Sequence, residues 1–283
     1  MAIKLLVDSA SDIDLEEANR LGISMIPMEV RFGEEEFLDG VNLSHRQFFE
    51  KLIECEELPK TSQINAYAFA ERFKELTANG DEVIAVVISS KLSGTYNSAK
   101  EAAKEFAGKV HVIDSMNACI GERIIAEYAL RLIKEGYKAT EIVEKVESVK
   151  DKVKVLGLLG TLKYLKKGGR ISAVVALTGE VFSIKPVVAV TGGEVKLVGK
   201  AVGSKKGNNL LCQLVEKSGG IDFDMPFAGG YSGLGNEVFK KYLEDSRHLW
   251  EGKTTSVPEY MIGSTIGTHI GPGAVAVAFF AKQ

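Results

Sequence analysis

Val83-Ile84-Ala85-Val86-Val87-Ile88 runs directly into Ser89-Ser90-Lys91-Leu92-Ser93-Gly94-Thr95, and this junction predicts the architecture of the chain. An unbroken apolar run rich in β-branched residues is typical of a strand buried on both faces of a parallel sheet. The segment from Ser98 to Phe106 then has the composition of a helix. Ser93 and Gly94 therefore lie where the carboxyl end of a strand meets a helix N-terminus, the edge at which open α/β sheets bind ligands.

This junction has two interpretations. Free backbone N–H groups, the positive end of a helix dipole and the small hydroxyl of Ser93 together suit an anion. Alternatively, Ser93 only caps the helix, since serine is a preferred residue at that position. The junction alone leaves both interpretations open.

The order of predicted elements indicates two domains. In the first half strands alternate with helices, as in the strand at 110–115 and the helix at 118–134, which predicts a three-layer α/β domain with a mostly parallel sheet over residues 1–153. The pattern then changes, and a hairpin at 186–198 is followed by mixed helices and strands. We therefore expect an α+β domain over residues 154–283.

Turn-forming and helix-forming residues predict several local elements. Pro59 to Gln63 is expected to be a loop that leads into a helix, Phe227 to Gly230 an apolar bend, and Gly263 to Gly273 a glycine-rich loop. A continuous helix is expected from Glu237 to Leu249, and a strand from Thr254.

Polar side chains recur beside these bends and helix starts. Thr61 and Ser62 repeat the arrangement at Ser93, and two such ends converging on one crevice would make an anion site. Arg170 follows two glycines, so it either faces solvent or points into a cleft, where it would pair with a carboxylate or phosphate. His269 is the histidine best placed for acid–base or hydrogen-bonding work.

Two aspartates follow the first predicted strand. Asp8, with Ser9, either binds a cation or partner or accepts hydrogen bonds from turn amides, and the turn is the favoured interpretation. Asp12 is expected to cap the helix that begins near Leu15.

Composition excludes several classes of function. The 283 residues are 45% hydrophobic and 26% charged with a formal net charge of -3, and no basic cluster predicts nucleic-acid binding. No apolar run reaches membrane-span length and no signal peptide is expected, so we predict a cytoplasmic protein. Three scattered cysteines and four separated histidines predict neither disulfides nor a metal site. Phosphate-loop, dinucleotide and nucleophile-elbow motifs are absent.

Five motifs occur in order over essentially the whole chain. They are Asp8-Ser9-Ala10-Ser11-Asp12, Thr61-Ser62-Gln63, Ser90-Lys91-Leu92-Ser93-Gly94-Thr95-Tyr96-Asn97-Ser98-Ala99, Tyr164-Leu165-Lys166-Lys167-Gly168-Gly169-Arg170-Ile171 and Gly267-Thr268-His269-Ile270-Gly271-Pro272-Gly273. Together they resemble the DegV family of bacterial fatty-acid-binding proteins. One departure is Ile64, which stands where the family usually has proline.

The resemblance implies a carrier rather than an enzyme, with no cofactor and one long-chain fatty acid such as palmitate buried between the two domains. Thr61 and Ser93 would hydrogen-bond its carboxylate, and Arg170 and His269 would border it. The full set of implied ligand-binding residues is Thr61, Ser62, Ser93, Gly94, Arg170 and His269.

The resemblance also implies partners. Some family members are the binding subunit of a bacterial fatty acid kinase, whose catalytic subunit phosphorylates the presented carboxylate to an acyl phosphate for phospholipid synthesis. We expect no nucleic-acid partner, and at most transient contact with a membrane.

Physical chemistry agrees with a lipid carrier. An acyl chain of about sixteen carbons, at roughly 0.8 kcal/mol per buried CH₂, has over ten kcal/mol of gross driving force, which ordering costs reduce. A buried carboxylate needs several donors. Two alternatives stay open: an acyl hydrolase or transferase with Ser93 as nucleophile and His269 as base, and a carrier of another amphipathic anion.

Overall fold

The computed structural model describes residues 2–171 and 184–282. A four-stranded parallel sheet in the order β2-β1-β6-β7 forms the centre of the first half. Its strands are β1 (Ile3–Asp8), β2 (Ser24–Ile26), β6 (Glu82–Val87) and β7 (Val110–Asp114). The buried strand predicted from the apolar run is therefore confirmed as β6.

Helices cover both faces of this sheet. One face carries α1 (Leu15–Leu21), α5 (Ile120–Lys134) and α6 (Ala139–Val149), and the other α3 (Ala66–Thr77) and α4 (Thr95–Ala103). Along β6, Ile84 and Val86 pack on the α5 side, while Val83, Ala85 and Val87 pack on the α4 side. Because successive strand residues alternate between faces, an uninterrupted apolar strand supplies both halves of this core.

A six-stranded mixed sheet forms the second half, in the order β10-β9-β8-β13-β11-β12. Its strands are β8 (Val153–Leu158), β9 (Ile184–Thr191), β10 (Glu194–Val202), β11 (Phe227–Tyr231), β12 (Glu259–Met261) and β13 (Val275–Phe280). All neighbours are antiparallel except β11 and β12, and the predicted hairpin is confirmed as β9–β10.

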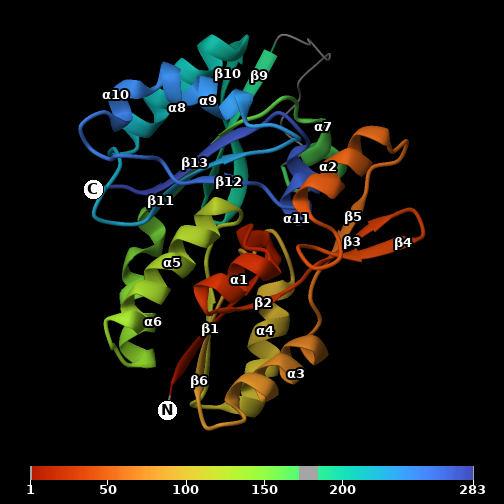
Figure 1. The fold of residues 1–283 in the computed structure, drawn as a ribbon, viewed down its shortest axis with the longest axis vertical. Coiled ribbons are helices and arrows are strands. Elements are labelled where there is room, and N and C mark those ends of the chain that lie inside the picture. Colours follow the sequence, from red (N-terminus) through yellow and green to blue (C-terminus); the bar gives the residue numbers. More distant parts are fainter. Residues whose placement is uncertain (1, 172–183, 283) are drawn as a thin grey trace.

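One face of the six-stranded sheet is covered by α8 (Ser204–Lys217), α9 (Glu237–Asp245) and α10 (Arg247–Trp250). Helix α5 packs against its other face, so that helix lies between the two large sheets (Figure 1). The predicted combination of a parallel α/β part and an α+β part is confirmed. The division at residue 153 stays a prediction, because the largest core cluster joins Val7 to Val155 and Ala276.

A third, small sheet stands beside the other two (Figure 1). It is antiparallel, in the order β4 (Glu35–Leu38), β3 (Glu29–Phe32) and β5 (Lys60–Ser62). Helix α2 (His45–Glu54), which begins with a capping box between Ser44 and Gln47, and α7 (Lys163–Lys167) lie near it. Helix α11 (Ser264–Ile270) packs against α2, α7, β3 and β5. Short 3-10 turns at Ser9–Ser11, Lys104–Phe106 and Lys150–Lys152 complete the elements.

Three local predictions are wrong because tertiary partners decide the backbone. The loop expected at 59–63 contains β5, since Lys60–Ser62 pairs with β3. The bend expected at 227–230 is the interior strand β11, paired with β12 and β13. The glycine-rich loop expected at 263–273 contains α11, whose N-terminal amides are bonded by distant aspartates.

Three boundary predictions also fail. Asp12 adopts a left-handed conformation with φ of 59°, and the residue that caps α1 is Asp14. The helix expected over 237–249 breaks at Ser246, whose hydroxyl accepts a hydrogen bond from Trp250 Nε1 at 2.9 Å. The strand expected from Thr254 begins only at Glu259, where the chain pairs with β11.

Candidate functional site

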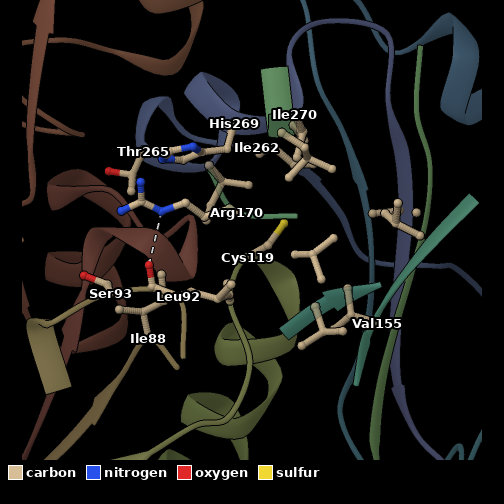
Figure 2. Close-up of a pocket in the computed structure, with 18 of the residues that line it drawn as sticks. Ile88, Leu92, Ser93, Cys119, Val155, Arg170, Ile262, Thr265, His269 and Ile270 are labelled. Atoms are coloured by element: carbon tan, nitrogen blue, oxygen red, sulfur yellow. Dashed lines mark hydrogen bonds between the residues drawn. The ribbon is translucent and has the colours of Figure 1, made fainter. Parts of the chain in front are cut away.

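A cavity of about 920 Å³, counting its open mouth, lies between the carboxyl edge of the parallel sheet, the six-stranded sheet and α11. Its lining is mainly apolar and includes Ile88, Leu92, Val155, Val188, Ile266 and Ile270. Figure 2 shows the polar side chains of Ser93, Arg170 and His269 toward one end and Val155 toward the other. The cavity is therefore amphipathic along its length.

Ser93 lies at the polar end, between β6 and α4. Its Oγ accepts a hydrogen bond from Thr95 N at 3.2 Å and lies 2.9 Å from Thr95 Oγ1. Thr95 Oγ1 in turn accepts from Ile64 N at 3.3 Å, so its own proton is best directed at Ser93. The prediction that Ser93 caps the helix is wrong, because the N-cap residue of α4 is Gly94. Ser93 instead closes a short turn that leads into α4, and its O–H stays free to donate into the cavity.

Gly94 is the N-cap residue of α4 and, being glycine, offers no side-chain cap. A Cβ at this position would overlap the side-chain oxygen of Gln63. Gln63 is held there by a 3.3 Å bond from its Nε2 to Ser98 Oγ. Glycine at 94 therefore lets the Thr-Ser-Gln segment lie over the start of α4, which brings two of the predicted motifs together.

Thr61 and Ser62 face opposite ways because they are neighbours on strand β5. Thr61 Oγ1 lies 3.0 Å from His269 Nε2, a contact between residues 208 positions apart. Ser62 lines the mouth of the cavity, but its hydroxyl donates to Glu29 Oε1 at 3.2 Å. Of this pair, Thr61 is the side chain directed at the other predicted site residues.

His269 lies in the last turn of α11 and its ring is largely buried. Burial, followed by the charge of Arg170, lowers its pKa to about 4. The imidazole is therefore neutral at neutral pH. Its Nδ1 packs against Gly168, where a Cβ would overlap it, and has no hydrogen-bond partner among the residues that the structure describes. If Nε2 carries the proton, it donates to Thr61, whose O–H is then free for a ligand.

Arg170 reaches across the cavity rather than into solvent. Its Nε donates to the Leu92 carbonyl at 3.3 Å, drawn as a dashed line in Figure 2, and its Nη1 donates to the Gly168 carbonyl at 2.7 Å. Of the two predictions for this side chain, the cleft-facing one is confirmed. Within the described part of the chain, Arg170 is the one charged residue in the lining.

Two buried aspartates hold the N-terminus of α11. Asp39 Oδ1 accepts from Ser264 N at 3.1 Å and from the Ser264 hydroxyl, and Asp39 Oδ2 accepts from Thr265 N at 3.0 Å. Asp12 Oδ1 accepts from Gly263 N at 2.8 Å. These bonds satisfy amides that the start of a helix leaves unpaired. They fix the helix that carries His269.

A third buried aspartate holds the edge of the parallel sheet. Asp8 accepts hydrogen bonds from Ala10 N and Ile88 N, each at 2.8 Å. The turn interpretation is therefore correct for the Ala10 bond, whereas Ile88 N on Asp8 and Met28 N on Ser9 Oγ are amides of distant segments. Burial raises the pKa of this carboxyl to about 7, although both amide bonds oppose the shift.

Asp39 and Thr265 were missed by sequence reasoning. Asp39 follows a short strand of the small sheet and acts on a helix 225 positions later, a separation at which a single sequence carries no signal. Thr265 was not identified because its segment was expected to be a glycine-rich loop. With the helix known, its i, i+4 spacing to His269 identifies it as lying on the same face.

The structure also bears on the hydrolase alternative, on metal binding and on membrane-spanning helices. Ser93 and His269 do not pair with each other: each is hydrogen-bonded to a threonine, so the dyad required by the hydrolase alternative is not assembled. Over residues 2–171 and 184–282, no group of three His, Cys, Asp or Glu side chains could hold a metal ion. None of the helices described there is both long and apolar enough to cross a membrane.

Comparisons with known proteins give matches over nearly the whole chain. Residues 2–282 match a family model described as "Uncharacterised protein, DegV family". A DegV domain-containing protein of Deinococcus radiodurans is 32% identical over 282 residues, covering 98% of each chain. Another, from Caldanaerobacter subterraneus, is 31% identical and covers 99% of each.

Solved structures with the same fold have been determined with lipid. A DegV family protein from Thermus thermophilus, described by its fatty acid binding, has a TM-score of 0.87 at 28% identity, covering 99% of this chain and 100% of that one. One from Eubacterium eligens, loaded with heptadecanoic acid, has a TM-score of 0.84 at 27% identity with the same coverage.

Proposed function

This chain belongs to the DegV family, and we propose that it binds one long-chain fatty acid in the cavity described above. The observation that carries the proposal is the cavity itself. It is apolar over most of its wall, gathers hydroxyls, an imidazole and one arginine at one end, and has no carboxylate among its described lining residues. An acid with a long apolar tail matches that distribution.

The tail would occupy the apolar part of the cavity between the two large sheets. At roughly 0.8 kcal/mol per buried CH₂, a chain of about sixteen carbons supplies enough driving force to hold the ligand through purification. The fatty acids bound by the relatives from Thermus thermophilus and Eubacterium eligens support this choice of ligand over other amphipathic anions.

The carboxylate would be bound at the polar end. Ser93 has a hydroxyl proton to donate, and Thr61 has one when His269 donates to it. The Gly94 amide at the start of α4 would add a third donor. Arg170 supplies positive charge while its Nε and Nη1 are committed to carbonyl oxygens, so it would act mainly through the field it creates.

We propose further that the bound acid is presented to a separate fatty acid kinase in the cytoplasm. A carboxylate oxygen would attack the γ-phosphoryl group of ATP, giving an acyl phosphate and ADP, for phospholipid synthesis. What supports this is the family resemblance, together with the exposed Ser62 and Gln63 at the mouth beside the polar end, where a partner could reach the head group.

The ligand is tested by mass spectrometry of an organic extract of the purified, denatured protein. We expect about one fatty acid per chain. If neither the extract nor a titration with a panel of free fatty acids gives binding, the cavity holds another class of ligand.

The presentation step is tested separately. Palmitate-loaded protein is mixed with ATP and a purified bacterial fatty acid kinase catalytic subunit, and the acyl phosphate is trapped as its hydroxamate. Product that requires this chain supports a carrier for a kinase, whereas binding without any product across several kinases would restrict the protein to storage or transport.

A further inference from the structure

Thr265, in the first turn of α11, has a buried hydroxyl without an assigned role. The residue is 3% exposed, and its Oγ1 has no hydrogen-bond partner among the residues that the structure describes. Thr268, three residues later on the same helix, behaves as threonine usually does in helices. Its hydroxyl donates to the carbonyl four residues back, Ser264 O, at 2.9 Å.

An unpaired buried hydroxyl requires an explanation, because it loses its bonds to water and gains none in return. Thr265 also lines the cavity, and Figure 2 shows it toward the same end as Arg170 and His269. The missing partner of the hydroxyl is therefore to be sought in the cavity's occupant.

The backbone of Thr265 is firmly held. Its amide donates to Asp39 Oδ2 at 3.0 Å, and it lies one helical turn before His269 on the same face of α11. The Thr265 side chain, fixed in this way on a short, anchored helix, therefore lies at a defined place at the polar end of the cavity wall.

We propose that Thr265 is a further ligand-binding residue, whose hydroxyl donates a hydrogen bond to an oxygen at the head-group end of the bound acid. This inference rests on the proposed function and adds to it a residue that contributes to specificity. The oxygen belongs either to the carboxylate or to a hydroxyl on a carbon close to it, as in a 3-hydroxy acid.

The test compares Thr265→Val with Thr265→Ser in delipidated protein, titrated with palmitate and with 3-hydroxypalmitate. Valine has nearly the shape of threonine without the hydroxyl, and serine keeps the hydroxyl. We expect the valine variant to bind at least one acid about five- to fiftyfold more weakly, the loss of one hydrogen bond to the ligand. The serine variant should stay close to wild type.

The thermal stability of the ligand-free protein is the second measurement. Here Thr265→Val should not lose stability, although its affinity for the ligand falls. Because the hydroxyl is unpaired without ligand, Thr265→Val should be at least as stable as wild type in thermal unfolding while binding less tightly. The matched control is Thr268→Val, which loses a real hydrogen bond and should unfold at a lower temperature with unchanged affinity, since Thr268 is not among the cavity-lining residues.

Each result of the Thr265→Val titrations has a distinct meaning. A loss for both acids assigns the oxygen to the carboxylate, and a loss confined to 3-hydroxypalmitate assigns it to the extra hydroxyl. Wild-type affinity of Thr265→Val for both acids overturns the inference and leaves the proposed function intact, as does a drop in ligand-free stability equal to that of the control. If wild type itself binds neither acid, the proposed function fails first and the inference falls with it.

Discussion

The cavity has two polar walls that are built in different ways. In the junction wall, residues 88–95, the site residue Ser93 is held by local hydrogen bonds to Ser89 and Thr95, while Asp8 and Asn117 hold the first two residues of the wall. The helix wall, α11, is held by residues more than 200 positions away: Asp39 at its start and Thr61 at its end. Asp39 and Thr61 both belong to or adjoin the small sheet, which therefore grips both ends of the helix.

This difference has an energetic consequence. A local turn re-forms whenever its own few residues fold, so losing one bond there should affect the ligand more than the fold. A buried helix terminus depends on distant carboxylates, so losing one of them leaves several amides unpaired at once. Removing an anchoring carboxylate of the helix wall should therefore lower stability and binding together, whereas removing the Ser93 hydroxyl of the junction wall should mainly lower binding.

The largest effect is expected from Asp39→Ala. It removes the acceptors of Ser264 N, the Ser264 hydroxyl and Thr265 N, all buried. We expect the free energy of unfolding in denaturant to fall by about 3 kcal/mol or more, since each unpaired buried group costs about 1–3 kcal/mol. Fatty-acid affinity should fall with it. A variant of wild-type stability would show that the helix wall is not held from the small sheet.

Acid should weaken the helix wall selectively through His269. The folded pKa is about 4, below the ordinary value of 6.5. Between these values the unfolded chain binds a proton at this histidine that the folded chain does not, so the free energy of unfolding rises with pH across that window. Lowering the pH from about 7 to about 4.5 should cost wild type roughly 2–3 kcal/mol more than it costs His269→Gln. Parallel stability curves for the two proteins would contradict this.

The hydroxyl donors of the two walls should matter mainly for binding. Ser93→Ala and Thr61→Ala should each weaken palmitate binding by about 1–3 kcal/mol, the cost of a lost hydrogen bond to a charged group. In calorimetric titration both should keep one site per chain, and Ser93→Ala should lose no more than about 1 kcal/mol of stability. Unchanged affinity in both variants would mean that the carboxylate binds elsewhere.

The smallest effect is expected from Ser62→Ala. Its exposed hydroxyl is already bonded to Glu29 on the outer side of β5, so we expect palmitate affinity and stability each to change by less than about 0.5 kcal/mol. This variant is the matched control for Thr61→Ala, one residue away on the opposite face. A loss of affinity as large as that of Thr61→Ala would bring Ser62 back into the head-group site.

The contrast between local and long-range hydrogen bonds also explains which elements could be predicted from the sequence. The apolar run that forms β6, the Ser93 junction and the β9–β10 hairpin carry local signals, and the structure has them at the expected positions. Helix α11 has four glycines around it and no capping side chain of its own, so its conformation depends on Asp39 and Asp12. A single sequence cannot show such pairings.

The candidate site likewise combines residues that the sequence predicts with features that only the structure reveals. The motifs around Thr61, Ser93, Arg170 and His269 drew attention to residues that the fold does bring to one cavity. Their convergence, the opposite orientation of Ser62 and the presence of Thr265 depend on strand alternation and helix packing between distant segments, and these appear only with the structure.

The most direct test of the account is the affinity of delipidated protein for palmitate and for its methyl ester. The two ligands share the tail. The ester carries no charge, and one of its two head-group oxygens bears a methyl group. If a carboxylate is bound by the donors of both walls, palmitate should bind at least about tenfold more tightly, the equivalent of one charge-assisted hydrogen bond. Equal affinities would show that the polar end of the cavity does not recognise a carboxylate, and would contradict the account.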